Sequence, residues 1–260
     1  GSASVLGAVV SYPVVREAAF NLNANVALDH KTFTNDVAGI QLNDKSIRLA
    51  TFTLAGDVSD RAFGGGLTQF ALAWGRGRLD LAGNAGDLAA DQTGPQRQGA
   101  FGKLGWQLAR LQRITEADTL ALSWSGQRAQ RNLDSAEKFG ATGSSGVRAY
   151  SSSEPSADDG QLLSIEWRRQ VTDKLSVAAY HDRASLQRDH RENSATLSPN
   201  HFTLAGTGFG VSWGRANELL VRGGLAWRQG ENPVRNVATG ADSDGTHRNP
   251  RLYVSLLKIF

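Results

Sequence analysis

Apolar and polar residues alternate with a period of two along most of this chain. Between Phe20 and Asp29 the even positions carry Phe, Leu, Ala, Val and Leu, and the odd positions carry mainly Asn. The same alternation returns around Trp124, Trp227 and Val254. Successive side chains of a strand point to opposite faces, so this pattern indicates β-strands whose two faces meet different surroundings. Helical periodicity is almost absent, and we expect an all-β fold.

The alternating segments are longer than the strands of most soluble proteins, which typically have about five or six residues. A tilted strand needs about 9–11 residues to cross a bilayer. We predict eleven strands of this length, at residues 4–13, 17–31, 45–57, 66–80, 98–112, 117–130, 160–170, 174–187, 201–213, 217–229 and 249–260.

The connections between the predicted strands alternate in length. Short turns are expected at 14–16, 58–64, 114–116, 172–173 and 214–216, and long polar loops at 32–44, 81–97, 131–159, 188–200 and 230–248. Short turns at one rim and long loops at the other are typical of outer-membrane barrels. The sequence therefore predicts an antiparallel transmembrane β-barrel domain that occupies residues 1–260.

A soluble two-sheet sandwich would also show alternation. Two features favour the barrel: the apolar face carries the tryptophans with almost no charge between them, and the other face carries Asn, Ser, Thr, Gln and Arg on strand after strand. No apolar run approaches the roughly 18 residues of a membrane helix. The formal net charge is only +3 and the basic residues are scattered, so no nucleic-acid partner is expected.

The loop at 131–159 is rich in glycine and carries a single Val-Arg-aromatic tip. It resembles the signature loop of two-partner secretion transporters, the haemolysin-activator and filamentous-adhesin exporters of the POTRA-containing translocase superfamily. The family pattern is Phe, a Gly-Gly pair, and then Val-Arg-Gly/Ala-Tyr/Phe. Thr142 departs from it, because glycine is usual there. The residues that carry the resemblance, and that we expect to form a functional loop, are Phe139, Gly143, Val147, Arg148, Ala149 and Tyr150.

Further stretches resemble the same family in the same order along the chain. They are the periplasmic turn Tyr12-Pro13-Val14-Val15-Arg16, the strand after the loop at 159–166, the segment Tyr180-His181-Asp182-Arg183-Ala184, and the closing strand at 250–260.

The resemblance implies a place for this chain within a larger barrel. The family barrel has sixteen strands, preceded by a plug helix and two POTRA domains, and the first strand predicted here would be its sixth. We therefore expect a barrel fragment that lacks the POTRA domains, the plug helix and the first barrel strands. The resemblance also makes 131–159 an extracellular loop that folds inward.

Arg148 is the candidate functional side chain of this loop. In a water-filled lumen it would gain from a fixed carboxylate, because an arginine–carboxylate pair combines charge with defined geometry. The resemblance names Asp182 as the salt-bridge partner, and Glu166 is the alternative. Alternation places both carboxylates on the polar faces of their strands. The simpler alternative is an exposed loop arginine.

The resemblance implies translocation of a large secreted partner protein, an adhesin, cytolysin or contact-dependent toxin, across the Gram-negative outer membrane. The other implied partners are membrane lipid, lipopolysaccharide, and the barrel-assembly machinery, which would read a C-terminal signal at Leu256 and Phe260 of a monomeric barrel. No cofactor, metal or catalytic residue is expected, because neither the histidines nor the serines show ligand or nucleophile spacing. A passive porin-like channel and a structural or adhesive barrel remain alternatives, and an outer-membrane enzyme is the last of them.

Overall fold

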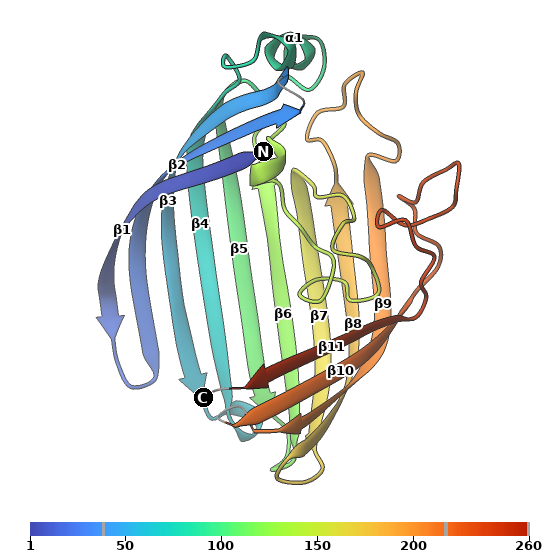
Figure 1. The fold of residues 1–260 in the computed structure, drawn as a ribbon. Helices are drawn as coiled ribbons and strands as arrows, with labels where there is room; N and C mark the ends of the chain where they lie inside the picture. The colour runs from blue at the N-terminus through green and yellow to red at the C-terminus, as the bar shows by residue number, and fades with distance from the viewer. Residues whose placement is uncertain (38–39, 216–217, 259–260) are drawn as a thin grey trace.

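The computed structural model describes residues 1–37, 40–215 and 218–258, and they form one antiparallel sheet in which each strand pairs with the next along the chain. Figure 1 shows this sheet curving into a wall. The strands are β1 (Ser2–Arg16), β2 (Phe20–Val37), β3 (Ile40–Asp60), β4 (Gly66–Asp80), β5 (Gly99–Arg113), β6 (Asp118–Ala129), β7 (Asp159–Gln170), β8 (Leu175–Gln187), β9 (His201–Gly214), β10 (Leu219–Arg228) and β11 (Arg251–Lys258). The all-β prediction and the eleven strands are confirmed.

The convex face of the sheet carries the apolar half of the alternation. Leu28, Trp74 and Phe209 are 57%, 53% and 61% exposed. Side chains of this size gain free energy when they leave water, so a continuous apolar face of this kind suits contact with lipid. No helix among the described residues is long and apolar enough to cross a membrane.

The concave face differs from the uniformly polar interior that the alternation predicts. Two buried apolar clusters lie on it, one around Leu49, Leu79 and Phe101 and the other around Phe202 and Leu204. Both include residues of the loop 131–159, so the apolar side chains on this face pack under the loop. Because the loop covers these side chains, they do not face water and can be apolar, which explains the departure from the polar pattern.

Three predicted connections were wrong. The turn at 14–16 belongs to β1, whose Arg16 pairs with Asn21. The loop at 32–44 is mostly strand, because β2 and β3 stay paired beyond the apolar region, with Phe33 opposite Lys45. Polar side chains on both faces concealed this ladder, which satisfies backbone groups whatever the side chains are. The loop at 81–97 contains a helix, α1 (Ala85–Thr93).

Helix α1 and the short 3-10 helices η1 (Ala62–Gly64) and η2 (Ser135–Glu137) complete the described elements. The side chain of Asn84 accepts a hydrogen bond from the backbone N–H of Asp87 at 3.0 Å, which caps α1. The loops at 131–159, 188–200 and 230–248 contain no strand in their described residues, in agreement with the prediction. Part of the predicted turn at 214–216 lies outside the described residues.

β1 and β11 lie at the two edges of the sheet and are each paired on one side only. Figure 1 shows β11 crossing in front of the wall beside β10. Unpaired strand edges expose N–H and C=O groups that favour pairing with another strand.

Candidate functional site

The loop 131–159 leaves β6, descends on the concave side of the sheet and returns to β7 (Figure 1). Its two arms are joined where Phe139 and Ala157 exchange backbone hydrogen bonds of 2.7 and 2.9 Å. The chain closes on itself below this bridge, since the N–H of Val147 donates to the carbonyl of Ala141 at 2.8 Å. The loop is therefore a folded unit with internal hydrogen bonds.

A glycine at position 143 fits this fold. Gly143 has φ +84°, a left-handed conformation that side chains rarely adopt, and a Cβ there would lie 2.9 Å from the Cβ of Ser152. Thr142, which departs from the family pattern, forms a bridge with Val147 instead.

The tip of the loop packs against the sheet through small and aromatic side chains. Val147, Ala149 and Tyr150 are fully buried, in a cluster that includes Phe202 and Leu204 of β9. The hydroxyl of Tyr253 in β11 donates to the carbonyl of Tyr150 at 2.9 Å.

Arg148 extends from this buried tip toward β7 and β8. Its Nε and Nη2 donate to the two carboxylate oxygens of Asp182, each at 2.8 Å, and its backbone N–H donates to the same carboxylate at 3.1 Å. Its Nη1 contacts the carboxylate of Glu166. The guanidinium lies 3.3 Å from the centre of the Tyr180 ring. Ser164 donates to Asp182 at 2.7 Å, so this carboxylate accepts from Ser164 as well as from Arg148.

The charges at this site reinforce one another. Burial disfavours the charged guanidinium of Arg148, but its hydrogen bonds and charge interactions with Asp182 and Glu166 outweigh burial and raise its pKa. Arg148 is therefore a permanent cation. The Asp182 side chain is only 1% exposed, so removal of Arg148 would leave a buried carboxylate without its cation.

One glycine of β9 makes room for the tip, because a Cβ added at Gly206 would lie 2.5 Å from the Cβ of Ala149. Gly208 makes room for the ring of Tyr180, whose nearest atoms would lie 2.4 Å from a Cβ there. By contrast, a Cβ at Gly210 would meet nothing closer than 3.6 Å. The wall therefore accommodates the tip at Gly206.

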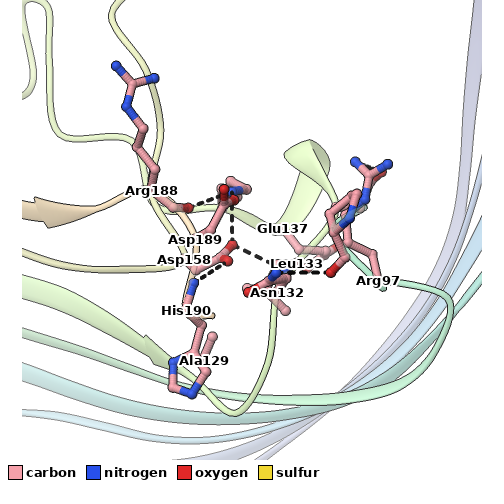
Figure 2. A network of polar contacts seen from close by, with 12 residues as sticks. Arg97, Ala129, Asn132, Leu133, Glu137, Asp158, Arg188, Asp189 and His190 are labelled. Carbon is pink, nitrogen blue, oxygen red and sulfur yellow. Dashed lines mark hydrogen bonds and ion pairs between the residues drawn. The ribbon is translucent and has the colours of Figure 1, made fainter. Parts of the chain in front are cut away.

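The upper part of the loop is fixed by a second polar network (Figure 2). The buried carboxylate of Asp158 accepts from the backbone N–H groups of Leu133 and His190 at 3.1 and 2.9 Å. Lys138 lies 3.2 Å from Asp158 and 2.9 Å from Asp189 in the loop 188–200. Burial raises the pKa of Asp158, and the nearby Lys138 charge opposes that shift.

The start of the loop is also tied to the strands that precede it in the chain, β2, β3 and β5. Glu137 pairs with Lys31 of β2 at 2.7 Å and with Lys103 of β5 at 2.8 Å. Asp134 pairs with Lys45 of β3 at 2.8 Å. All three lysines face the concave side, so these ion pairs span the space between the loop and the strands.

The arm that returns to β7 contacts the loop 230–248. Glu154 accepts hydrogen bonds from Asn232 at 2.9 Å and from Ser243 at 2.8 Å. No cation pairs with Glu154 among the described residues, and burial raises its pKa. Asp242, beside it, pairs with Arg251 at 2.7 Å.

The structure brings most of the candidate residues together. Arg148 contacts both carboxylates that the sequence offered as alternatives, and the six loop residues lie within one packed unit. Leu256 lies apart, 68% exposed on the convex face of β11, and Phe260 lies outside the described residues.

Sequence reasoning missed the wall residues that receive the loop. Lys31, Lys45 and Lys103 stand on the polar face of their strands, and the acidic residues of the loop are their natural counter-charges. The position and charge of these residues indicate that such ion pairs can form, but they do not predict which lysine pairs with which carboxylate. The sequence gives no comparable signal for Gly206.

A sheet of long antiparallel strands with an apolar convex face and long loops at one rim defines the wall of an outer-membrane β-barrel. The chain belongs to the family of haemolysin secretion/activation proteins ShlB/FhaC/HecB, whose model matches residues 1–213. Family and fold together place it in the outer membrane of Gram-negative bacteria.

Curated relatives match the chain over its whole length. Heme/hemopexin transporter protein HuxB of Haemophilus influenzae strain 86-028NP is 24% identical over 267 residues, which cover 100% of this chain and 45% of that protein. HuxB of strain ATCC 51907 is 23% identical over 271 residues, with the same coverage. The chain thus spans slightly under half the length of these relatives.

Two solved structures share the fold. CdiB from Escherichia coli superposes with a TM-score of 0.73 at 15% identity, covering 98% of this chain and 44% of that one. CdiB from Acinetobacter baumannii gives a TM-score of 0.67 at 13% identity, covering 87% of this chain and 38% of that one.

Proposed function

We propose that the protein containing this chain carries a large secreted partner protein across the outer membrane. Membership of the haemolysin secretion/activation family supports this function, and one observation of the site carries it. The loop 131–159 sits inside the curve of the wall, where apolar packing of its tip is accompanied by ion pairs and hydrogen bonds along its length. These polar contacts can exchange for water when the loop moves.

In this proposal the action of the loop is conformational and needs no covalent catalysis. The ion pairs of Arg148 with Asp182 and Glu166 define the docked state of the loop, and passage of the partner protein requires that these ion pairs break. The long loops face the cell exterior and the short turns face the periplasm. The chain is the later part of a sixteen-stranded barrel, and the earlier strands cover the open edges of β1 and β11.

The remaining partners follow from the same proposal. The barrel is monomeric, its apolar face contacts lipid and lipopolysaccharide, and the assembly machinery recognises the C-terminal strand with Leu256 and Phe260. HuxB is a heme/hemopexin transporter protein, so a partner of a heme- or hemopexin-related class is a further candidate, and the identity of the polypeptide cross-linked in the test below would distinguish it from the others.

Cross-linking from the lumen tests the transport proposal. A cavity of about 680 Å³ lies below the tip, and Ser176 of β8 lines it. A photoreactive amino acid in place of Ser176 of the full-length protein should cross-link to one large polypeptide during export. The same residue in place of Ala179, on the convex face of the strand, should not. Absence of any polypeptide adduct from position 176 in exporting cells would contradict transport through this lumen.

A charge exchange tests the ion pair between Arg148 and Asp182. Arg148→Asp and Asp182→Arg should each reduce export by the full-length protein, because each leaves like charges facing one another. The double variant restores an opposite pair and should recover part of the export. Recovery no greater than that of either single variant would remove the support for a functional pair.

A further inference from the structure

A group of unpaired arginines lies on the convex face, near the ends of the strands that carry the long loops. Arg48 of β3 and Arg78 of β4 stand directly opposite one another in the sheet, and His30 of β2 is opposite Arg48. Arg76 follows two residues along β4 on the same face, and all three arginines are exposed.

None of these three guanidinium groups has a hydrogen bond or ion pair to another residue within 1–37, 40–215 and 218–258. The charges of Arg78 and Arg48 act on the nearby Asp80, but its carboxylate makes no ion pair with them and accepts instead from the Ala82 N–H at 3.0 Å and from Gln98 at 3.4 Å.

Arginines on the same face near the short turns behave differently. Arg110 pairs with Asp60 at 2.7 Å, and Arg169 lies 3.5 Å from Asp118. Each of these two arginines is thus ion-paired to a carboxylate, whereas none of the three guanidinium groups at the loop rim forms an ion pair within the described residues.

The position of Arg48 opposite Arg78 destabilises the sheet, because like charges that face one another on neighbouring strands repel. An anion bound between the two guanidinium groups would replace this repulsion by attraction. The planar guanidinium binds two phosphate oxygens at once, so phosphate is the anion that two adjacent arginines suit best.

The surface beside the arginines is apolar. An open groove of about 790 Å³ crosses β1 to β4, and its lining includes Leu6 and Leu28 together with the three arginines. Phe52 and Trp74, which stand opposite one another, continue the exposed apolar surface away from the loop rim. A cationic group at the border of an apolar face fits a ligand with a phosphorylated head and acyl chains.

We propose that Arg48, Arg76 and Arg78 form a binding site for the phosphorylated headgroup of lipopolysaccharide in the outer leaflet. The phosphates bridge Arg48 and Arg78 and contact Arg76, and the acyl chains lie along Leu28 and the apolar surface beyond it. This site rests on the orientation in the proposed function, in which the long loops face outward and the arginines lie at the height of the outer-leaflet headgroups.

The test uses the full-length protein in detergent and three lipids: bisphosphorylated lipid A, dephosphorylated lipid A and phosphatidylglycerol. The variant replaces Arg48→Gln and Arg78→Gln together. Its affinity for bisphosphorylated lipid A should fall about 30-fold, since each basic side chain near a lipid headgroup contributes roughly a fivefold factor. Wild-type protein should bind the dephosphorylated lipid and phosphatidylglycerol more weakly.

Arg183→Gln is the matched control. Arg183 is exposed on the same face of β8, but its neighbours across the sheet are Leu163 and Ala205. Its replacement should leave the affinity for bisphosphorylated lipid A within about twofold of wild type. An unchanged affinity in the double variant would overturn the site, and so would equal binding of phosphatidylglycerol by the wild type.

Thermal unfolding separates a lipid site from a structural role. Without lipid, the double variant should unfold at the same temperature as wild type or higher, because the repulsion between Arg48 and Arg78 is gone. With bisphosphorylated lipid A, only wild type should gain stability. Lower stability of the variant in lipid-free detergent would overturn the site. Both readouts are independent of export, so the lipid site and the transport function can fail separately.

Discussion

The substitution Asp182→Asn in the full-length protein tests how the tip of loop 131–159 is held. Asparagine keeps the shape of the side chain and removes its charge. Arg148 now donates two side-chain hydrogen bonds of 2.8 Å to this carboxylate, which is 1% exposed. Hydrogen bonds to a charged group contribute about 1.5–3 kcal/mol, and Glu166 retains its own contact with Arg148. We expect the docked tip to lose about 2–3 kcal/mol.

Hydrogen exchange measures this loss directly. A change of about 1.4 kcal/mol alters an equilibrium tenfold, so tip amides at 141–150 should exchange about 30- to 150-fold faster in Asp182→Asn. Amides of β4 should keep their rates. Ser176→Ala is the control, because Ser176 lies on the concave face of the same strand and has no hydrogen-bond partner among the described residues. Tip exchange within about twofold of wild type, or an equal effect of Ser176→Ala, would refute the reasoning.

Three further predictions concern other contacts of the loop. Gly206→Ala should displace the tip, because the new Cβ would lie 2.5 Å from that of Ala149, whereas Gly210→Ala should leave tip exchange unchanged. Glu154→Gln should strengthen the contact with the loop 230–248 at neutral pH. Burial raises the pKa of Glu154, so the protonated form is favoured in the docked state, and wild-type docking should weaken as the pH rises above the ordinary pKa of a glutamate. Proteolysis of the loop should show this pH dependence in wild type and lose it in Glu154→Gln. Lys45→Ala should leave Asp134 buried without this cation and increase cleavage near residue 135, with no change in the exchange of the tip amides.

The sequence was most informative for strands whose two faces lie in different surroundings. From Phe20 to Asp29 one face contacts lipid and the other does not, so the alternation located β2 and its orientation. From 32 to 37 and from 40 to 44 polar residues occupy positions on both faces and the alternation is weak, so the same strand pair was mistaken for a loop. The helix at Ala85–Thr93 has little apolar periodicity, and its main signal was the capping Asn84.

The candidate site was reached by a different route. The tip residues around Arg148 were chosen by family resemblance, and strand alternation put Asp182 and Glu166 on the concave face. Contacts such as Glu137 with Lys103 join segments 34 residues apart in the chain. They depend on how deeply the loop enters the curve of the wall, which neither alternation nor local motif specifies. The fit of Gly206 to Ala149 likewise depends on the final packing.

The most direct test of transport compares the proteins released by, or displayed on, cells that make the full-length protein with those of a strain lacking its gene. One large polypeptide should be lost from the surface and medium of the deletion strain and should accumulate in the periplasm. The wild-type gene should restore its export, and a gene with Arg148→Asp should not. An unchanged set of exported proteins, together with altered permeability to small solutes, would contradict transport of a partner protein and favour a passive channel.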